Sequence, residues 1–306
     1  MATNPQSPKR SRRIFLAVVG GVLALAVLGL AAFRLISGKP LGIRYFVEVQ
    51  TWRAASLVKA VAHARDVQSQ SKGAYTNVIF LHHSVGDNLI QQTDFRAQLA
   101  NAGLSLWDHD YNYYGLRDSA GNSTGYNYFI PDDNTDPDGL AALFSQKVYG
   151  LPVNAISGLM QHEVIVFKSC FTGNVLGDDP QVEQVKGYYE TVRSFIAAHP
   201  EKLFILLTTP PLNSSEADAA MGVRARSIAD WLMSAEFKGD LPNLVVFDLY
   251  DRLADGDPAS PQYNRLRSDY LEGSDNHPTA RANQDVAAEL SAFIVQSIQD
   301  FRSRQE

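Results

Sequence analysis

Cysteine is almost absent from this chain of 306 residues, in which Cys170 is the single example. An intrachain disulfide is therefore excluded, and the fold depends on its hydrophobic core. The sequence also lacks a repeat of fixed period, which excludes a solenoid or a propeller. Hydrophobic residues make up 45% of the chain and charged residues 20%, as in ordinary globular proteins. We expect one large domain after about the first forty residues.

Basic residues are scarce outside the N-terminus. The first 39 residues contain six of the 27 Lys and Arg and none of the 33 Asp and Glu. The remainder therefore has 21 basic against 33 acidic residues, a net charge of −12. Proteins that bind nucleic acid need clustered Lys and Arg to replace the counterions of phosphates. The composition predicts no nucleic-acid partner, and the acidic surface favours solubility.

Charged residues are missing from residues 14–33, "IFLAVVGGVLALAVLGLAAF". Twenty helical residues at about 1.5 Å each cross a hydrocarbon core of roughly 30 Å, so this segment predicts a transmembrane helix. The basic residues before it predict a cytoplasmic N-terminus and an extracytoplasmic domain anchored to the membrane. The run "SRRIFLA" also resembles a twin-arginine export signal, so a cleaved signal is the alternative to an uncleaved anchor.

These patterns divide the chain into four parts. Residues 1–13 are a basic cytoplasmic tail, and residues 14–36 are the transmembrane anchor or twin-arginine-type signal. Residues 37–74 hold a stem helix and a linker, because apolar or small side chains such as Val58 recur there at spacings of three and four. Residues 75–306 form the exported domain.

Short apolar runs alternate with amphipathic helical segments in this domain. The runs are "NVIFLHH", "LSLWDHDYNYY", "HEVIVFKSC", "KLFILLTTPP" and "NLVVFDLY", with helices after the first run and near residues 181–199, 216–235 and 279–302. This alternation predicts an α/β fold with a mainly parallel, five-stranded sheet covered by helices on both faces. Ligands of such sheets bind beyond the carboxyl ends of the strands.

Polar side chains follow the first predicted strand directly, where His82, His83 and Ser84 end the run "NVIFLHHS". A serine at a strand-to-helix turn has its own N–H at a helix N-terminus, which stabilises negative charge. To act as a nucleophile it also needs a base. The candidate base is His277 in "SDNHPTARAN", just before the last predicted helix, and Asp275 is close enough in sequence to orient its imidazole.

In these motifs and their order the sequence resembles the SGNH hydrolases, the GDSL-like esterases and acetylhydrolases, over roughly residues 75–300. The matching features are a serine after the first strand with Gly86 two residues on, "KSCFTGN" after a middle strand, and "DNHPT" before the final helix. The resemblance implies a three-layer α/β/α, flavodoxin-like fold. It also implies Ser-His catalysis with no metal and no other cofactor.

The resemblance also implies a role for each site residue. Ser84 is the nucleophile, His277 the base and Asp275 the group that orients His277. The oxyanion hole consists of the N–H of Ser84, the N–H of Gly115 and the side chain of Asn174.

Three features depart from the family pattern. His82 and His83 replace the Gly-Asp that usually precedes the serine, and we assign them to supporting positions around the site. Ser274 stands three residues before His277, where the family has its acid, and Asp275 stands two before. The block "KSCFTGN" replaces a short Gly-x-Asn-Asp motif, so the oxyanion asparagine is assigned by position.

Other interpretations of individual residues stay open. Cys170 is a thiol nucleophile or a small buried hydrophobe. His82, His83 and Asp87 are a metal site only if distant ligands join them. The segment "NTDPDG", which starts at Asn134, is a solvated acidic turn or an incomplete calcium loop.

These features predict an extracytoplasmic serine ester hydrolase. Its substrate is a small-molecule or carbohydrate ester, including the acyl or acetyl esters of envelope carbohydrate. Two alternatives remain, an acyltransferase acting on surface polysaccharide and a non-catalytic carbohydrate-binding or scaffold domain on the same fold. The expected partners are the ester substrate and, through the N-terminal helix, the membrane. The sequence gives no indication of an oligomeric state.

Overall fold

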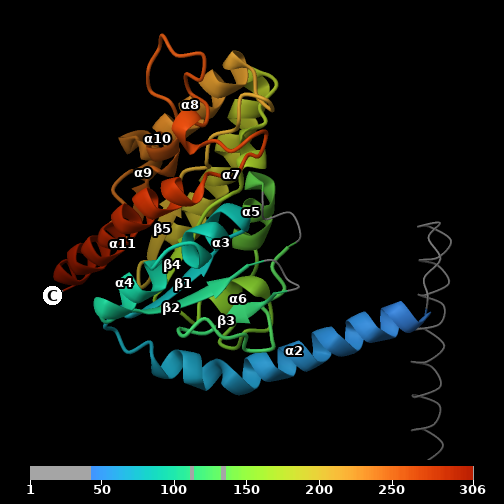
Figure 1. Ribbon diagram of the computed structural model, residues 1–306. Coiled ribbons are helices and arrows are strands. Elements are labelled where there is room, and N and C mark those ends of the chain that lie inside the picture. Colours follow the sequence, from blue (N-terminus) through green and yellow to red (C-terminus); the bar gives the residue numbers. More distant parts are fainter. Residues whose placement is uncertain (1–42, 111–113, 132–135, 306) are drawn as a thin grey trace, which may run out of the picture. The chain divides into compact units, whose positions relative to one another are not determined.

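The computed structural model describes residues 43–110, 114–131 and 136–305 (Figure 1). The predicted tail and membrane anchor, residues 1–13 and 14–36, lie outside these ranges. None of the helices within the described ranges is both long and apolar enough to span a bilayer.

Helix α2, Ile43–Ser69, occupies most of the predicted stem. The chain divides into two compact units inside this helix, after Ala54, and the second unit contains the sheet. In that unit α2 buries a stripe of mostly small side chains, Ser56, Ala60, Ala64 and Val67. Val58, expected on the packed face, is 69% exposed. On the face that packs, Ser56 accepts a hydrogen bond from the buried backbone N–H of Asn127, 2.8 Å away.

The domain is built on a six-stranded sheet in the order β3-β2-β1-β4-β5-β6, parallel except for β3. The strands are β1 Asn77–Leu81, β2 Ser105–His109, β3 Leu116–Arg117, β4 Val164–Phe167, β5 Leu203–Leu207 and β6 Leu244–Phe247. The five predicted strands are confirmed. The sixth, β3, was missed because two residues are too short to show an alternating pattern.

The order of the parallel strands reverses between β1 and β4. Counted along the chain without β3, the parallel strands lie in the order 2-1-3-4-5, which is the flavodoxin-like order. Leu81 at the end of β1 lies beside Phe167 at the end of β4. Such a reversal opens a crevice at the carboxyl ends of the two strands, because their connections leave in opposite directions. The residues after Leu81 and after Phe167 therefore meet there.

Helices cover both faces of the sheet. The helices beyond α2 are α3 Ser84–Gln91, α4 Phe95–Asn101, α5 Pro137–Phe144, α6 Ala155–Leu159, α7 Asp179–Ala197, α8 Ala219–Met233, α9 Ala235–Lys238, α10 Leu249–Leu253 and α11 Ala280–Ser303, with 3₁₀ turns η1 Phe171–Asn174 and η2 Ser268–Tyr270. Buried side chains of α3, α4 and α11 pack on one face, and those of α5, α6 and α7 pack on the other. The described residues thus form the predicted α/β/α layers.

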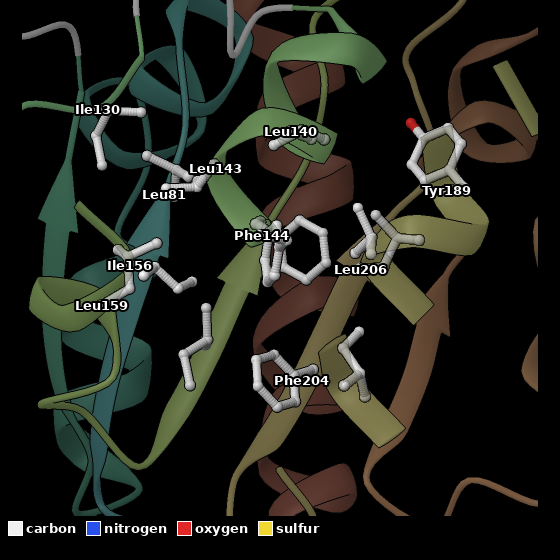
Figure 2. Packing of buried hydrophobic residues seen from close by; sticks show 14 of the residues in the cluster. Leu81, Ile130, Leu140, Leu143, Phe144, Ile156, Leu159, Tyr189, Phe204 and Leu206 are labelled. Atoms are coloured by element: carbon white, nitrogen blue, oxygen red, sulfur yellow. The ribbon is translucent and has the colours of Figure 1, made fainter. Parts of the chain in front are cut away.

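The strands alternate between the two cores, as period-two geometry requires. In β1, Phe80 belongs to the core under α3 and α11, and Leu81 to the core under α5 and α7. Figure 2 shows the core under α5 and α7, where Phe144 of α5 lies over the strands. Its ring centroid is 4.9 Å from that of Phe167. Both faces of the central strands are therefore fully packed, and only their ends are available for a site.

Candidate active site

Ser84 is the first residue of α3, three residues after the end of β1. His83 is the N-cap in an extended conformation, and its carbonyl accepts the N–H of Gly86 (2.7 Å) and of Asp87 (3.1 Å). Ser84 and Val85 stand in the helix before the residues that make these bonds. Their N–H groups therefore lie at the positive end of the helix, where a developing negative charge is stabilised. The location of Ser84 at a strand-to-helix turn agrees with the expectation from the sequence.

The side chain of Cys170 contacts that of Ser84. Cys170 follows β4 on the other side of the strand reversal, and its Sγ lies 3.8 Å from Ser84 Oγ. The thiol is buried, and the Ser84 side chain is half-buried. The sequence singled out Cys170 but gave no reason to place it beside the serine, because strand order cannot be read from composition.

His277 lies in the turn before α11 and is held by Asp275. The carboxylate Oδ1 of Asp275 accepts the backbone N–H of His277 at 3.0 Å and lies 2.6 Å from Nδ1 of its ring. Hydrogen bonds from the backbone and ring of His277 lower the pKa of Asp275. With Nδ1 donating to this carboxylate, Nε2 is left as the basic nitrogen.

His277 and the helix of Ser84 line the same pocket, which has a volume of about 240 Å³. The ring of His277 also packs edge to face against the ring of Phe171, the residue after Cys170, with 5.9 Å between the ring centroids. In the described structure no hydrogen bond joins Ser84 to His277. Ser84 itself is not among the residues that line this pocket, and its catalytic pairing with His277 stays a prediction.

Gly115 lies between β2 and β3 with φ +70°, in the left-handed region that favours glycine. A Cβ at this position would come within 2.6 Å of the carbonyl oxygen of Tyr126. Backbone conformation and this close approach are enough to require a glycine. The predicted oxyanion role of its N–H stays a prediction.

Asn174 is buried at the end of η1, and its amide nitrogen donates to two carbonyls, of Thr209 at 3.2 Å and of Pro210 at 2.8 Å. These bonds tie η1 to the segment after β5. Both amide hydrogens are occupied, so a role in the oxyanion hole would require one of them to be released.

Asn174→Ala is therefore expected to lower the free energy of unfolding by about 1–3 kcal/mol, because two buried carbonyls lose their donor. Urea denaturation of the variant and the wild type measures this loss. The turnover of the folded variant tests the second role. A loss of about 10² to 10³ in kcat would support the predicted oxyanion contact, and an unchanged kcat would exclude it.

His82 is fully buried beneath α3 and belongs to a charged network. Its Nε2 lies 3.2 Å from Asp108 Oδ2, and Asp108 also pairs with Arg96 and, at 3.1 Å, with Arg117. Arg117 reaches 3.0 Å to Asp87 in the first turn of α3. Burial by itself raises the pKa of Asp108, but the hydrogen bond and charge of His82 and the charge of Arg96 lower it to about 2. The network links the outer strands β2 and β3 to the helix that carries Ser84.

This network also bears on the metal interpretation of His82, His83 and Asp87. Asp87 is paired with an arginine, and His82 with a carboxylate. Within the described ranges, no three His, Cys, Asp or Glu side chains are arranged to hold a metal ion. The segment that begins at Asn134 lies partly outside the described residues.

Lys168 is a feature that the sequence interpretation missed. It directly follows β4, is 1% exposed, and its Nζ makes one long hydrogen bond of 3.4 Å to the carbonyl of Ser169. Burial lowers its pKa, and the charges of Cys170 and Asp110 oppose that shift. The signal was a lysine directly after the four apolar residues of "VIVF", a position where burial is expected.

No protein-family model matches the chain, and no curated protein matches it. Two solved structures resemble it. A protein of Bacteroides fragilis to which an acylhydrolase activity is ascribed is 12% identical, with 73% of this chain and 88% of that one covered at a TM-score of 0.44. A protein of Streptococcus pneumonia described as a platelet activating factor is 14% identical, with 82% of this chain and 98% of that one covered at a TM-score of 0.45. The fold assignment given above rests on the strand order, and the chemistry rests on the residues of the site.

Proposed function

We propose that this chain is a serine ester hydrolase of the SGNH type. The observation that carries the proposal is the orientation of His277 by Asp275 in a pocket that one face of α3 also lines. A histidine held by a carboxylate through Nδ1 and open at Nε2 is the base that a serine nucleophile requires. The position of Ser84 at the N-terminus of α3, beside the strand reversal, supports the same chemistry.

The reaction follows from these positions. Ser84 Oγ attacks the ester carbonyl while Nε2 of His277 takes the hydroxyl proton. The negative charge on the carbonyl oxygen is stabilised at the N-terminus of α3, with the N–H of Ser84 as one donor. His277 then gives its proton to the leaving alcohol as the carbon–oxygen bond breaks. Water, activated by the same histidine, releases the acid from the acyl-serine.

Labelling with a fluorophosphonate tests the proposal on the full chain. The probe phosphonylates an activated serine, so we expect one adduct, located on Ser84 by peptide mass spectrometry. Heat-unfolded protein is the control and should not react. An adduct on another residue, or none on the folded protein, would remove the assignment of Ser84.

A non-catalytic binding domain on the same fold is the second candidate. Two observations favour it: Ser84 Oγ lies against the thiol of Cys170, and both amide hydrogens of Asn174 are already bonded. A domain of this kind would bind an ester or its carbohydrate and leave it intact. Absence of labelling, together with retained binding of ligand, would favour this candidate.

The proposed location is the extracytoplasmic side of a membrane, with the chain anchored through residues 14–36 or exported by them. The support is the uncharged segment 14–33 and the basic residues that precede it. A protease added to cells whose outer envelope has been removed, with the cytoplasmic membrane intact, should degrade the domain. Protection of the domain until the cytoplasmic membrane is lysed would contradict this location.

A further inference from the structure

The pocket beside His277 is bounded by α3 on one side and by the turn leading into α11 on the other. Its lining residues are Asn88, Gln92, Glu272, Asp275, His277, Pro278, Thr279 and Ala280. Six of these eight side chains can form hydrogen bonds, two of them are carboxylates, and the lining contains no lysine or arginine. At about 240 Å³ it is smaller than the roughly 300–1,000 Å³ typical of pockets for drug-sized ligands, so it fits one small moiety.

The predicted nucleophile does not line the pocket, but it lies one helical turn before Asn88, which does. Ser84, Asn88 and Gln92 are spaced four residues apart, and residues at this spacing lie on one face of a helix. His277 forms the opposite wall. An ester whose carbonyl lies at Ser84 can extend one of its two arms along this face of α3 toward the pocket. The arm that His277 protonates on departure is the alcohol.

Several lining groups are available to a ligand. In the described structure the side-chain amide of Asn88 makes no hydrogen bond, and Glu272 forms no ion pair. Gln92 Oε1 accepts from Asn283 at 2.8 Å, which leaves the amide hydrogens of Gln92 as donors. The pocket thus offers donors and acceptors side by side. A hydroxyl group, which both donates and accepts, satisfies such a surface better than an apolar group or an anion.

We propose that this pocket is the subsite for the alcohol part of the ester, that it accepts a neutral polyhydroxyl group such as a single sugar ring, and that it rejects an anionic one. The inference rests on the proposed hydrolase function. The amides of Asn88 and Gln92 donate to ring hydroxyls, and Glu272 accepts from them. A carboxylate or phosphate on the alcohol would be repelled mainly by Glu272, because the lining contains no arginine or lysine and Asp275 is already bonded to His277.

The test compares kcat/KM for two substrates of one shape: an acetylated methyl glucoside and the corresponding acetylated methyl glucuronide. We expect the full-length wild type to prefer the neutral ester by about tenfold or more. The preference should shrink at about 1 M salt, because the Debye length then falls to about 3 Å. 4-Nitrophenyl acetate, which has no sugar, serves as the common reference.

Two variants locate the preference in the pocket. Glu272→Gln keeps the shape and removes one charge, so the preference should fall by about threefold or more. Asn88→Ala should lower the ratio of kcat/KM for the glucoside ester to that for 4-nitrophenyl acetate by about tenfold. Glu190→Gln is the matched control, since it removes a carboxylate from α7, outside this pocket, and should leave both ratios unchanged.

The outcomes separate the subsite from the proposed function. Hydrolysis of 4-nitrophenyl acetate with equal kcat/KM for the two sugar esters would overturn the subsite and leave the hydrolase in place. A preference unaffected by Glu272→Gln and Asn88→Ala would also overturn it. Failure of the wild type to cleave any of the three esters would overturn the hydrolase, and the subsite with it.

Discussion

Ser84→Ala is expected to lower kcat for ester hydrolysis by about 10⁴-fold or more, with a much smaller change in KM. Alanine has no oxygen that can be acylated, so only binding and the remaining charge stabilisation would act on the substrate. The measurement is steady-state hydrolysis of 4-nitrophenyl acetate by the full chain. Ser303→Ala, at the exposed end of α11, is the matched control and should retain wild-type rates.

The activity of variants at His277 tests whether Ser84 and His277 act together. If the serine and the histidine act as one unit, His277→Ala costs about as much as Ser84→Ala, and the double variant is no worse than either single one. Asp275→Asn should also lower kcat, by up to about 10⁴-fold, because an amide N–H that donates to Nδ1 holds the imidazole in the wrong tautomer. Independent, multiplying losses would contradict the pairing. Retained activity in Ser84→Ala with loss in Cys170→Ala would instead favour the thiol.

Asp108→Asn is expected to lower the free energy of unfolding at neutral pH by about 3 kcal/mol, because a buried carboxylate that pairs with two arginines is removed. Asp108 is fully buried and contacts His82, Arg96 and Arg117. Urea denaturation of the full chain measures the difference. Asp240→Asn, an exposed position before β6, should stay within about 0.5 kcal/mol of the wild type.

The pH dependence of this difference identifies its electrostatic origin. The pKa of Asp108 falls from 3.8 to about 2 on folding, so its ionised form stabilises the folded state above about pH 3.8. This contribution, about 2 kcal/mol, is lost as the pH falls from 3.8 toward 2. The Asp108→Asn variant lacks this ionisable group, so the difference in free energy of unfolding between the two proteins should become smaller over that pH range. If the difference in free energy of unfolding stays constant from pH 5 to 2.5, the destabilisation of the variant comes from packing.

The strands could be predicted because their apolar runs are buried on both faces, which leaves a continuous hydrophobic signal. β3 could not, because two residues are too few to show an alternating pattern, and its Leu116 is held by the carbonyl of Tyr126, ten residues further along the chain. The packed face of α2 was misjudged because hydrophobicity favoured Val58, whereas the contact is made by small side chains and the hydroxyl of Ser56. Local periodicity indicates that a helix exists more reliably than it indicates what the helix contacts.

The residues of the candidate site also fall into two groups, those with a local sequence signal and those whose surroundings depend on tertiary packing. Ser84, Asp275 and His277 could be found because each stands at a turn with a local sequence signal. The bonds of Asn174 to the carbonyls after β5 could not be predicted, since they depend on tertiary packing. The pocket was also beyond the sequence, because Asn88 and Glu272 come from segments that only the packing of α11 on α3 brings together. The sequence suggested the reacting groups, whose roles stay predictions, and the structure supplied their surroundings.

The position of α11 has a consequence for biosynthesis. α11 follows every other described element in the chain, yet its buried side chains pack over Val78 and Phe80 of β1 and over α3. Asn283 and Ser291 of α11 bond to Gln92 and Gln98, residues made far earlier. Until α11 emerges, the part of this apolar face that α3 and α4 do not cover stays exposed. A growing chain of this kind folds late and through distant contacts, so it needs protection from aggregation until its synthesis reaches α11.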